Sequence, residues 1–155
     1  MRERIQQATK DAMKAGDKRR LSTLRLVTAA IKDRDIASRV DDKGHSTGRD
    51  RIEDPEIMQL LQKMIRQRRE SIEVYTQGGR QELADQEAAE IAVIEEFLPK
   101  QMSEAELKKA TGDVIAELGA TGLKDMGRVM SALKERFPGV MDVGKASAMV
   151  KEKLK

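Results

Sequence analysis

The stretch from Gln67 to Gln101 limits the folds open to this chain more than any other part of it. It reads QRRESIEVYTQGGRQELADQEAAEIAVIEEFLPKQ, with apolar residues at helical spacing on both sides of Gly78-Gly79. Paired glycines permit the positive φ that a tight reversal needs, and a helix rarely continues into a proline such as Pro99. The stretch therefore predicts an antiparallel helical hairpin that reverses at Gly78-Gly79 and ends at Pro99.

The chain before this hairpin also has helical periodicity, and no segment alternates like a β-strand. Two helices are expected, from about Arg2 to Ala15 and from Asp17 onward, with Asp17 as the cap of the second. The polar segment from Ser38 to Arg51 predicts an exposed loop. Asp54-Pro55 is expected to cap and open the first helix of the hairpin.

Three shorter helical patterns follow Pro99, beginning near Ser103, Met126 and Asp142. Ser103 and Glu106 have the spacing of a capping box, which marks a helix start. The predicted fold is therefore all-α, with an N-terminal helical bundle in residues 1–98 and a small three-helix tail domain in residues 99–155.

Composition excludes several classes of function. The chain has no cysteine, so disulfides, thiolate zinc sites and cysteine nucleophiles are absent. Only 2% of the residues are aromatic, so the core must be aliphatic. The charged, amphipathic N-terminus lacks the apolar centre of a signal peptide, and no apolar run approaches the ~20 residues that span a bilayer. These features predict a cytoplasmic protein without a membrane segment.

Charge is distributed unevenly along the chain. The net charge is +3, and residues 99–155 hold all of it, with eleven Lys or Arg against eight Asp or Glu. The first part is nearly neutral overall but strongly acidic from Glu82 to Glu96. Such asymmetry either orients a partner or a neighbouring helix, or reflects solvated faces alone.

Arg68 interrupts the apolar stripe of its helix, because steps of seven residues from Leu61 reach Arg68 and then Tyr75. In an antiparallel hairpin that turns at the two glycines, Arg68 is level with Glu87 or Glu90. We expect an ion pair between the two helices, because a buried charge without a partner is costly. This pair would have a structural role in fixing the helix register.

Two basic groups are candidates for RNA contact. Arg66, Arg69 and Arg80 are expected around the hairpin tip with Tyr75, where arginine and an aromatic ring could stack on unpaired bases. The alternative is that Tyr75 simply covers the end of the core.

The second group lies at a predicted helix start in the tail. Asp125 is expected to cap that helix, while the backbone near Gly127 and the charge of Arg128 and Lys124 could hold a phosphate. An ordinary capped helix is the alternative. The candidate RNA-binding residues are Lys124, Arg128, Lys134, Lys145, Arg69 and Arg80.

No residue set has the pattern of an active site. His45 is the only histidine and lies in the polar segment near Asp41 and Asp42, without the spacing of a metal site. There is no Ser-His-Asp arrangement, no HExxH and no glycine-rich phosphate loop after a strand. We therefore predict no catalytic residue, no metal and no cofactor.

Three segments, QRRESIEVYTQGGRQELADQE, EEFLPKQMSEAEL and KDMGRVMSALK, occur in this order along the chain. Together they resemble the YqeY family, whose tail is similar to the C-terminal tail region of the tRNA-dependent amidotransferase B subunit. The resemblance covers nearly the whole chain and implies a helical bundle joined to a smaller helical tail. One departure is Val140-Met141-Asp142, which keeps the acid but lacks the basic residue typical of the family after Pro-Gly.

The resemblance implies three functions. The first is a non-catalytic accessory module that contacts tRNA through the basic tail. The second is a helical adaptor for an amidotransferase or another translation-associated protein. The third is carbon–nitrogen ligase activity with glutamine as amide donor, which the family label carries, although the catalytic domain of the larger enzyme is absent from this sequence.

Overall fold

The computed structural model describes residues 1–155 and contains seven α-helices and no strands. The all-α prediction is confirmed. The chain folds into two compact units, Met1–Leu98 and Pro99–Lys155. The first unit contains α1 (Arg2–Ala15), α2 (Lys18–Ala37), α3 (Asp54–Gln77) and α4 (Gln81–Glu95). The second contains α5 (Glu104–Leu118), a 3₁₀ turn η1 (Leu123–Asp125), α6 (Met126–Arg136) and α7 (Val143–Leu154).

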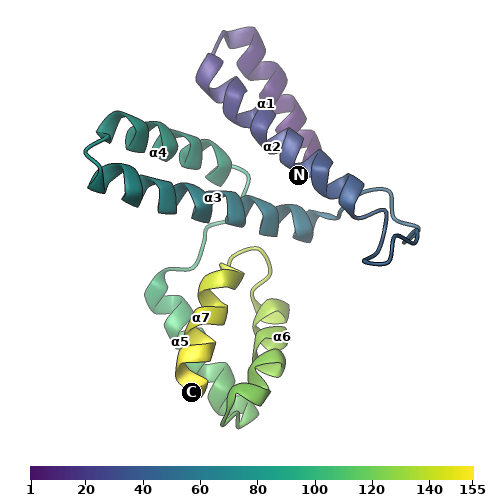
Figure 1. The fold of residues 1–155 in the computed structure, drawn as a ribbon, viewed down its shortest axis with the longest axis vertical. Helices are drawn as coiled ribbons and strands as arrows, with labels where there is room; N and C mark the ends of the chain where they lie inside the picture. The colour runs from purple at the N-terminus through teal and green to yellow at the C-terminus, as the bar shows by residue number, and fades with distance from the viewer. The chain divides into compact units, whose positions relative to one another are not determined.

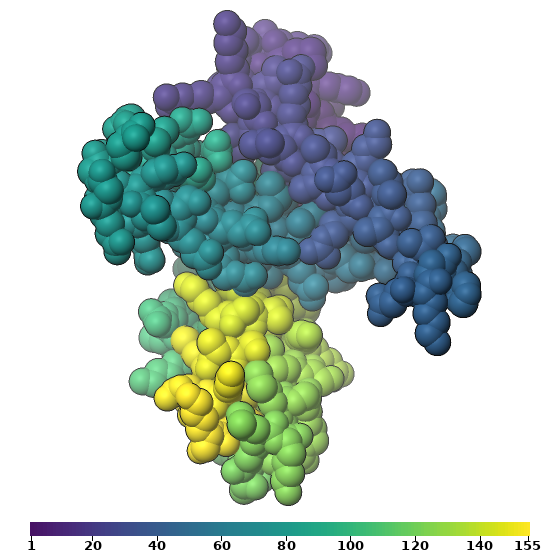
Figure 2. Space-filling model, viewed as in Figure 1, coloured from purple at the N-terminus to yellow at the C-terminus, as the bar shows by residue number.

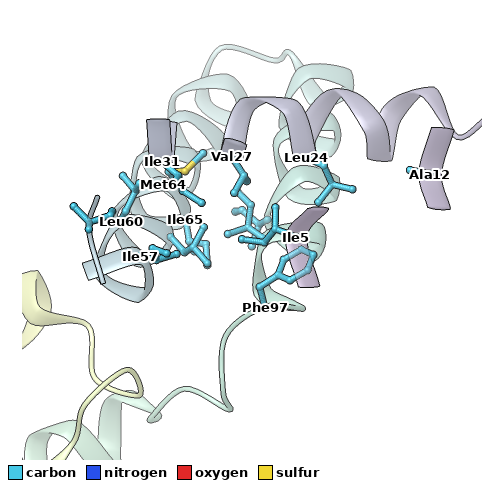
Figure 3. Packing of buried hydrophobic residues seen from close by; sticks show 14 residues of the cluster. Ile5, Ala12, Leu24, Val27, Ile31, Ile57, Leu60, Met64, Ile65 and Phe97 are labelled. Carbon is cyan, nitrogen blue, oxygen red and sulfur yellow. The ribbon is translucent and has the colours of Figure 1, made fainter. Parts of the chain in front are cut away.

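The first unit is built from two helical hairpins, α1–α2 and α3–α4, and α2 packs against both helices of the second (Figure 1). Apolar residues at helical spacing bring one stripe of each helix into a common core. Figure 3 shows Ile5, Leu24, Val27 and Ile57 pointing into this core together with Phe97. Burying each such side chain contributes about 1.5–3 kcal/mol.

Helix ends in this unit follow local chemistry. Gly16 ends α1 in the left-handed conformation, at φ +69°, and the Asp17 side chain accepts the N–H of Arg20 at 3.1 Å to cap α2. The prediction that Asp54 caps α3 is wrong by one position. Asp54 is the first helical residue, and the preceding Glu53 is the cap.

The α3–α4 hairpin reverses at the predicted glycines. Gly79 has φ +72°, and the N–H of Arg80 reaches the carbonyl of Tyr75 at 2.8 Å. Helix α4 ends at Glu95, whereas the sequence predicts an end at Pro99. The last turn tightens because the N–H of Phe97 bonds to the carbonyl of Ile94 at 3.2 Å, which turns the buried Phe97 ring into the core.

Residues 39–51, between α2 and α3, are exposed, as the sequence indicates, and they are held by local hydrogen bonds, whereas the following Ile52 is buried in the core. The Asp41 carboxylate accepts the N–H groups of Lys43 at 2.9 Å and His45 at 2.8 Å. Val40 and Ser46 form an isolated antiparallel bridge, which is too short to count as a strand.

The second unit is a three-helix domain in which α5, α6 and α7 contact one another (Figure 1). Its core is aliphatic and includes Leu107, Val114, Val129, Leu133 and Val150. Ser103 caps α5 and Asp142 caps α7, each through a side-chain oxygen that accepts a backbone N–H three residues on. No helix in the chain is long and apolar enough to cross a membrane.

Candidate nucleic-acid interface

The start of α6 is where the sequence predicts a phosphate site. Asp125 precedes the helix, but its carboxylate makes no capping bond to α6. Its Oδ2 accepts the N–H of Thr121 at 3.0 Å, and its Oδ1 lies 3.2 Å from Nη2 of Arg128. The Thr121 N–H lowers the pKa of the Asp125 carboxyl below its ordinary value, so the group is ionised at neutral pH. Asp125 therefore occupies the predicted cap position, but its carboxylate closes the turn that precedes the helix and makes no capping bond.

This geometry limits what Arg128 can offer a phosphate. The Arg128 side chain is 54% exposed, but an incoming anion would share it with the Asp125 carboxylate. Lys124 lies one residue before Asp125, is exposed, and has no acidic partner. Of the two cations at this end of α6, Lys124 is therefore the one more available to a phosphate.

Lys134 and Lys145 lie elsewhere in the second unit. Lys134 is in the last turn of α6 and Lys145 in the first turn of α7, so they lie on either side of the connecting loop. Both are exposed and lack an acidic partner. Since 11 residues of α6 span roughly 16 Å, the four predicted residues form two separate pairs at opposite ends of this helix.

The basic residues predicted for the hairpin tip do not form one group. Nη2 of Arg69 lies 3.2 Å from Oε1 of Glu95, the last residue of α4. Arg80 directly precedes the other end of α4, and its Nε lies 3.1 Å from Glu82 Oε1. Arg69 is also roughly 12 Å along α3 from the turn, since each helical residue advances the chain by 1.5 Å. A single base-stacking platform at the tip is therefore not present.

Arg68 lies between Glu87 and Glu90 of α4. Its Nε donates to Oε2 of Glu90 at 2.8 Å, Glu87 Oε2 lies 4.0 Å away, and Nη1 donates to the Met64 carbonyl at 3.2 Å. Burial raises the pKa of Glu87, the nearby Glu90 raises it further, and Arg68 opposes both effects. The expected contact between the two helices is present, and its role in fixing their register stays a prediction.

The acidic α4 is largely neutralised within its own unit. Besides the Arg68 and Arg69 contacts, Nη1 of Arg20 on α2 lies 2.5 Å from Oε2 of Glu96, just after α4. The acidic stretch of the sequence therefore orients neighbouring helices, which is one of the two interpretations of the charge pattern.

The side chains that could bind a metal ion do not come together at one place. No group of three or more His, Asp or Glu side chains is positioned to hold a metal ion. His45 is largely exposed, and its Nδ1 lies 3.7 Å from the Asp41 carboxylate.

Comparison with known protein families supplies what the geometry alone does not. The family described as Yqey-like protein matches residues 2–154. The chain belongs to this family. The match includes both compact units, so the family is defined by the N-terminal helical unit and the C-terminal one together.

Two curated relatives of this Yqey-like chain share its sequence at moderate identity. One is "Altered inheritance of mitochondria protein 41, mitochondrial" of Lachancea thermotolerans, 31% identical over 111 residues, which are 70% of this chain and 54% of that protein. The protein of the same name from Eremothecium gossypii is 31% identical over 94 residues, which are 61% of this chain and 46% of that protein. The chain thus spans about half the length of the curated relatives it matches.

A second enclosed ion pair of this Yqey-like chain had no clear sequence signal. Arg2 of α1 donates to both carboxylate oxygens of Asp35 on α2, at 2.9 and 2.6 Å, and to the Ile52 carbonyl at 2.9 Å. The N–H of Ile52 returns a bond to Asp35 at 2.8 Å. The hydrogen bond from Arg2 lowers the pKa of the Asp35 carboxyl. This cluster joins three segments that are far apart in the sequence, and it positions the start of α3.

Proposed function

We propose that this chain binds tRNA through the basic surface of its C-terminal unit and acts as an accessory protein without amidotransferase activity of its own. The observation that carries the proposal is a set of exposed lysines in that unit that have no acidic partner. They are Lys100, Lys108, Lys109, Lys124, Lys134, Lys145 and Lys151. The resemblance of this unit to the tail of the amidotransferase B subunit supports tRNA as the polyanion.

The mode of binding that this surface favours is contact with phosphates. A lysine ammonium acts as a flexible point charge that releases counterions from the nucleic-acid backbone, which gives affinity without reading bases. The second unit contains one aromatic residue, the partly buried Phe137, so it offers no stacking platform for unpaired bases. We therefore expect recognition of tRNA shape and backbone.

The proposal is tested by fluorescence anisotropy with bulk tRNA and a duplex DNA of matched length, across a salt series. We expect preferential tRNA binding, with the logarithm of the association constant falling linearly with the logarithm of salt concentration. The variant Lys134→Ala/Lys145→Ala should weaken binding and reduce the salt slope by about 1 for each phosphate that no longer meets a lysine.

The variant Lys10→Ala/Lys14→Ala is the matched control, because it removes the same charge from exposed positions of α1 in the N-terminal unit. If the two variants weaken binding equally, attraction is nonspecific and the basic surface of the C-terminal unit is not the site. Equal affinity for tRNA and duplex DNA would contradict tRNA recognition. Glutamine- or ATP-dependent amide transfer by the purified chain would contradict the accessory role.

The compartment we propose is the cytoplasm, a reducing environment that suits a chain without cysteine. Both relatives carry "mitochondrial" in their names, so cell fractionation with detection of this chain is the appropriate test. Recovery in an organelle fraction would contradict the cytoplasmic assignment and leave the binding proposal standing.

A further inference from the structure

Helix α2 presents apolar residues to solvent as well as to the core. Leu24, Val27 and Ile31 are buried on its inner side. The opposite side, here called the outer face of α2, consists of exposed residues spaced four and three apart along the helix. These are Ser22, Leu26, Ala29, Asp33 and Ile36. Leu26 is 47% exposed and Ile36 is 50% exposed, so two large aliphatic side chains of this face lie in solvent.

A surface groove lies at the N-terminal half of this face. It is lined by Lys18, Leu21, Ser22, Arg25 and Leu26, so aliphatic and cationic side chains share one depression. Arg19 flanks the other side of the outer face by helical spacing. Neither Lys18, Arg19 nor Arg25 has an acidic partner. In Figure 2 the violet-to-blue α2 segment is visible on the near surface of the N-terminal unit.

The balance of charged residues on α2 indicates whether a partner of this helix should be acidic or basic. The helix carries six Lys or Arg residues and two Asp residues. Asp35 is occupied by Arg2, and Arg20 is occupied by Glu96. Asp33, which lies on the outer face, is therefore the one acid of α2 left to balance the remaining cations of the helix, so the positive charge lies beside this face, at Lys18, Arg19 and Arg25.

The combination of exposed aliphatic side chains and neighbouring cations on α2 favours some classes of partner over others. Phosphate contacts need cations, and base contacts need stacking or polar groups, so exposed Leu26 and Ile36 would add nothing to RNA binding. An amphipathic helix places its apolar stripe on such residues and its acids against the flanking cations. A second copy of this chain fits less well, because acids of α4 already pair with Arg68 and Arg69, and the adjacent Glu96 pairs with Arg20.

We infer that the outer face of α2 is a docking surface for an acidic amphipathic helix of another protein. This inference does not rest on the proposed tRNA binding, because it uses a different unit and different residues. Leu26 and Ile36 supply the apolar contact, and Lys18, Arg19 and Arg25 set the orientation and the preference for acidic sequences.

The test uses the full chain and a fluorescein-labelled synthetic peptide of about 18 residues, long enough for a helix in a groove. Leucines in the peptide recur at helical spacing, and glutamates occupy the other positions. A scrambled peptide of the same composition is the control probe. We expect the amphipathic peptide to bind at least about tenfold more tightly than the scrambled one, and Leu26→Glu/Ile36→Glu to weaken binding at least about tenfold. Arg19→Ala/Arg25→Ala should weaken binding and reduce its salt dependence.

The control variant Val74→Glu/Leu123→Glu adds the same two charges at exposed apolar positions outside α2 and should bind as the unmodified chain does. Circular dichroism and thermal melting establish that each variant is folded. Equal binding of the two peptides, or unchanged binding by Leu26→Glu/Ile36→Glu, would overturn the inference. So would a dimer in sedimentation that this variant dissociates, which would make a second copy the occupant. Loss of tRNA binding by Arg19→Ala/Arg25→Ala, with peptide binding unchanged, would assign the face to nucleic acid.

Discussion

Arg68 of α3 donates its Nε–H to the Glu90 carboxylate of α4 at 2.8 Å, and the two side chains are only 14% and 19% exposed. The contact joins the two arms of the α3–α4 hairpin about midway along α4. A one-residue shift of either helix would move one partner off the shared face, because neighbouring residues in a helix are about 100° apart. We therefore expect the Arg68–Glu90 ion pair to favour the observed register of α3 against α4.

Replacing Arg68 with methionine should lower the free energy of unfolding by about 1–3 kcal/mol. The substitution leaves Glu87 and Glu90 enclosed near each other without a cation, and an uncompensated enclosed charge is strongly unfavourable. Urea denaturation followed by circular dichroism measures the change at neutral pH.

The double variant Arg68→Met/Glu90→Leu is the control for the charge effect, because it replaces both partners with apolar groups of similar size. It should recover most of the lost stability, since replacing a whole ion pair is often neutral. A single variant as stable as the original chain would show that the pair contributes nothing.

Replacing Glu87 with glutamine should change stability in the direction opposite to that expected for a carboxylate stabilised by an ion pair. Burial raises its pKa, so the protonated form is favoured in the folded chain, and this contribution is lost as pH rises through the folded pKa. Glu87→Gln should therefore be slightly more stable than the original chain at pH 7, by less than about 1 kcal/mol, and equal to it below pH ~4.

Denaturation midpoints of Glu87→Gln across pH 4–8 test this expectation. Glu73→Gln is the matched control, because Glu73 is an exposed acid on the facing helix α3. A destabilised Glu87→Gln at pH 7 would mean that attraction to Arg68 outweighs burial.

The contrast between the two enclosed ion pairs shows how far the sequence could be interpreted. The position of Arg68 opposite Glu90 can be predicted by counting residues from the turn along each helix, because a hairpin with a known turn fixes which residues oppose each other. The Arg2–Asp35 pair could not be counted in this way. It depends on how α1 lies along α2 and on the path of residues 38–51, and neither has a periodic signal.

Two predicted capping bonds, from the side chains of Asp54 and Asp125, are not formed, and they fail for a common reason. Asp54 and Asp125 both have the residue type of a cap, but residue type does not say which backbone N–H is nearest. At α3 the cap is Glu53, and the Glu56 side chain accepts the Glu53 N–H at 3.3 Å. At α6 the turn of η1 brings the Thr121 N–H to Asp125. Short-range geometry of this kind shifts helix starts by a residue and changes what a candidate anion site can bind.

Asp35→Asn should lower the free energy of unfolding by about 1–2 kcal/mol at pH 7, because it weakens two charge-assisted hydrogen bonds from Arg2. The pKa of Asp35 is lowered in the folded chain, so its contribution is present above the unfolded value near 3.9 and is lost as pH falls through the folded pKa. The difference between the variant and the original chain should therefore shrink below pH ~4.

Thermal melts at pH 3, 5 and 7 measure this difference. Asp33→Asn is the matched control, because Asp33 is an exposed acid on the same helix without a cationic partner. A gap between Asp35→Asn and the original chain that stays constant down to pH 3 would show that ionisation of Asp35 is not the source of the stability.

Gly112 lies in the interior of α5, where glycine is about 1 kcal/mol less favourable than alanine. A Cβ added there would come within 2.9 Å of Nζ of Lys153, which donates to the Lys108 carbonyl at 3.2 Å. That atom is the end of a flexible, exposed side chain, so it can move at low cost.

Gly112→Ala should therefore stabilise the C-terminal unit by about 0.5–1 kcal/mol, measured by urea denaturation. The same substitution in a Lys153→Ala background separates the two effects. Stabilisation only in that background would mean that the Lys153 contact opposes the gain in helix propensity.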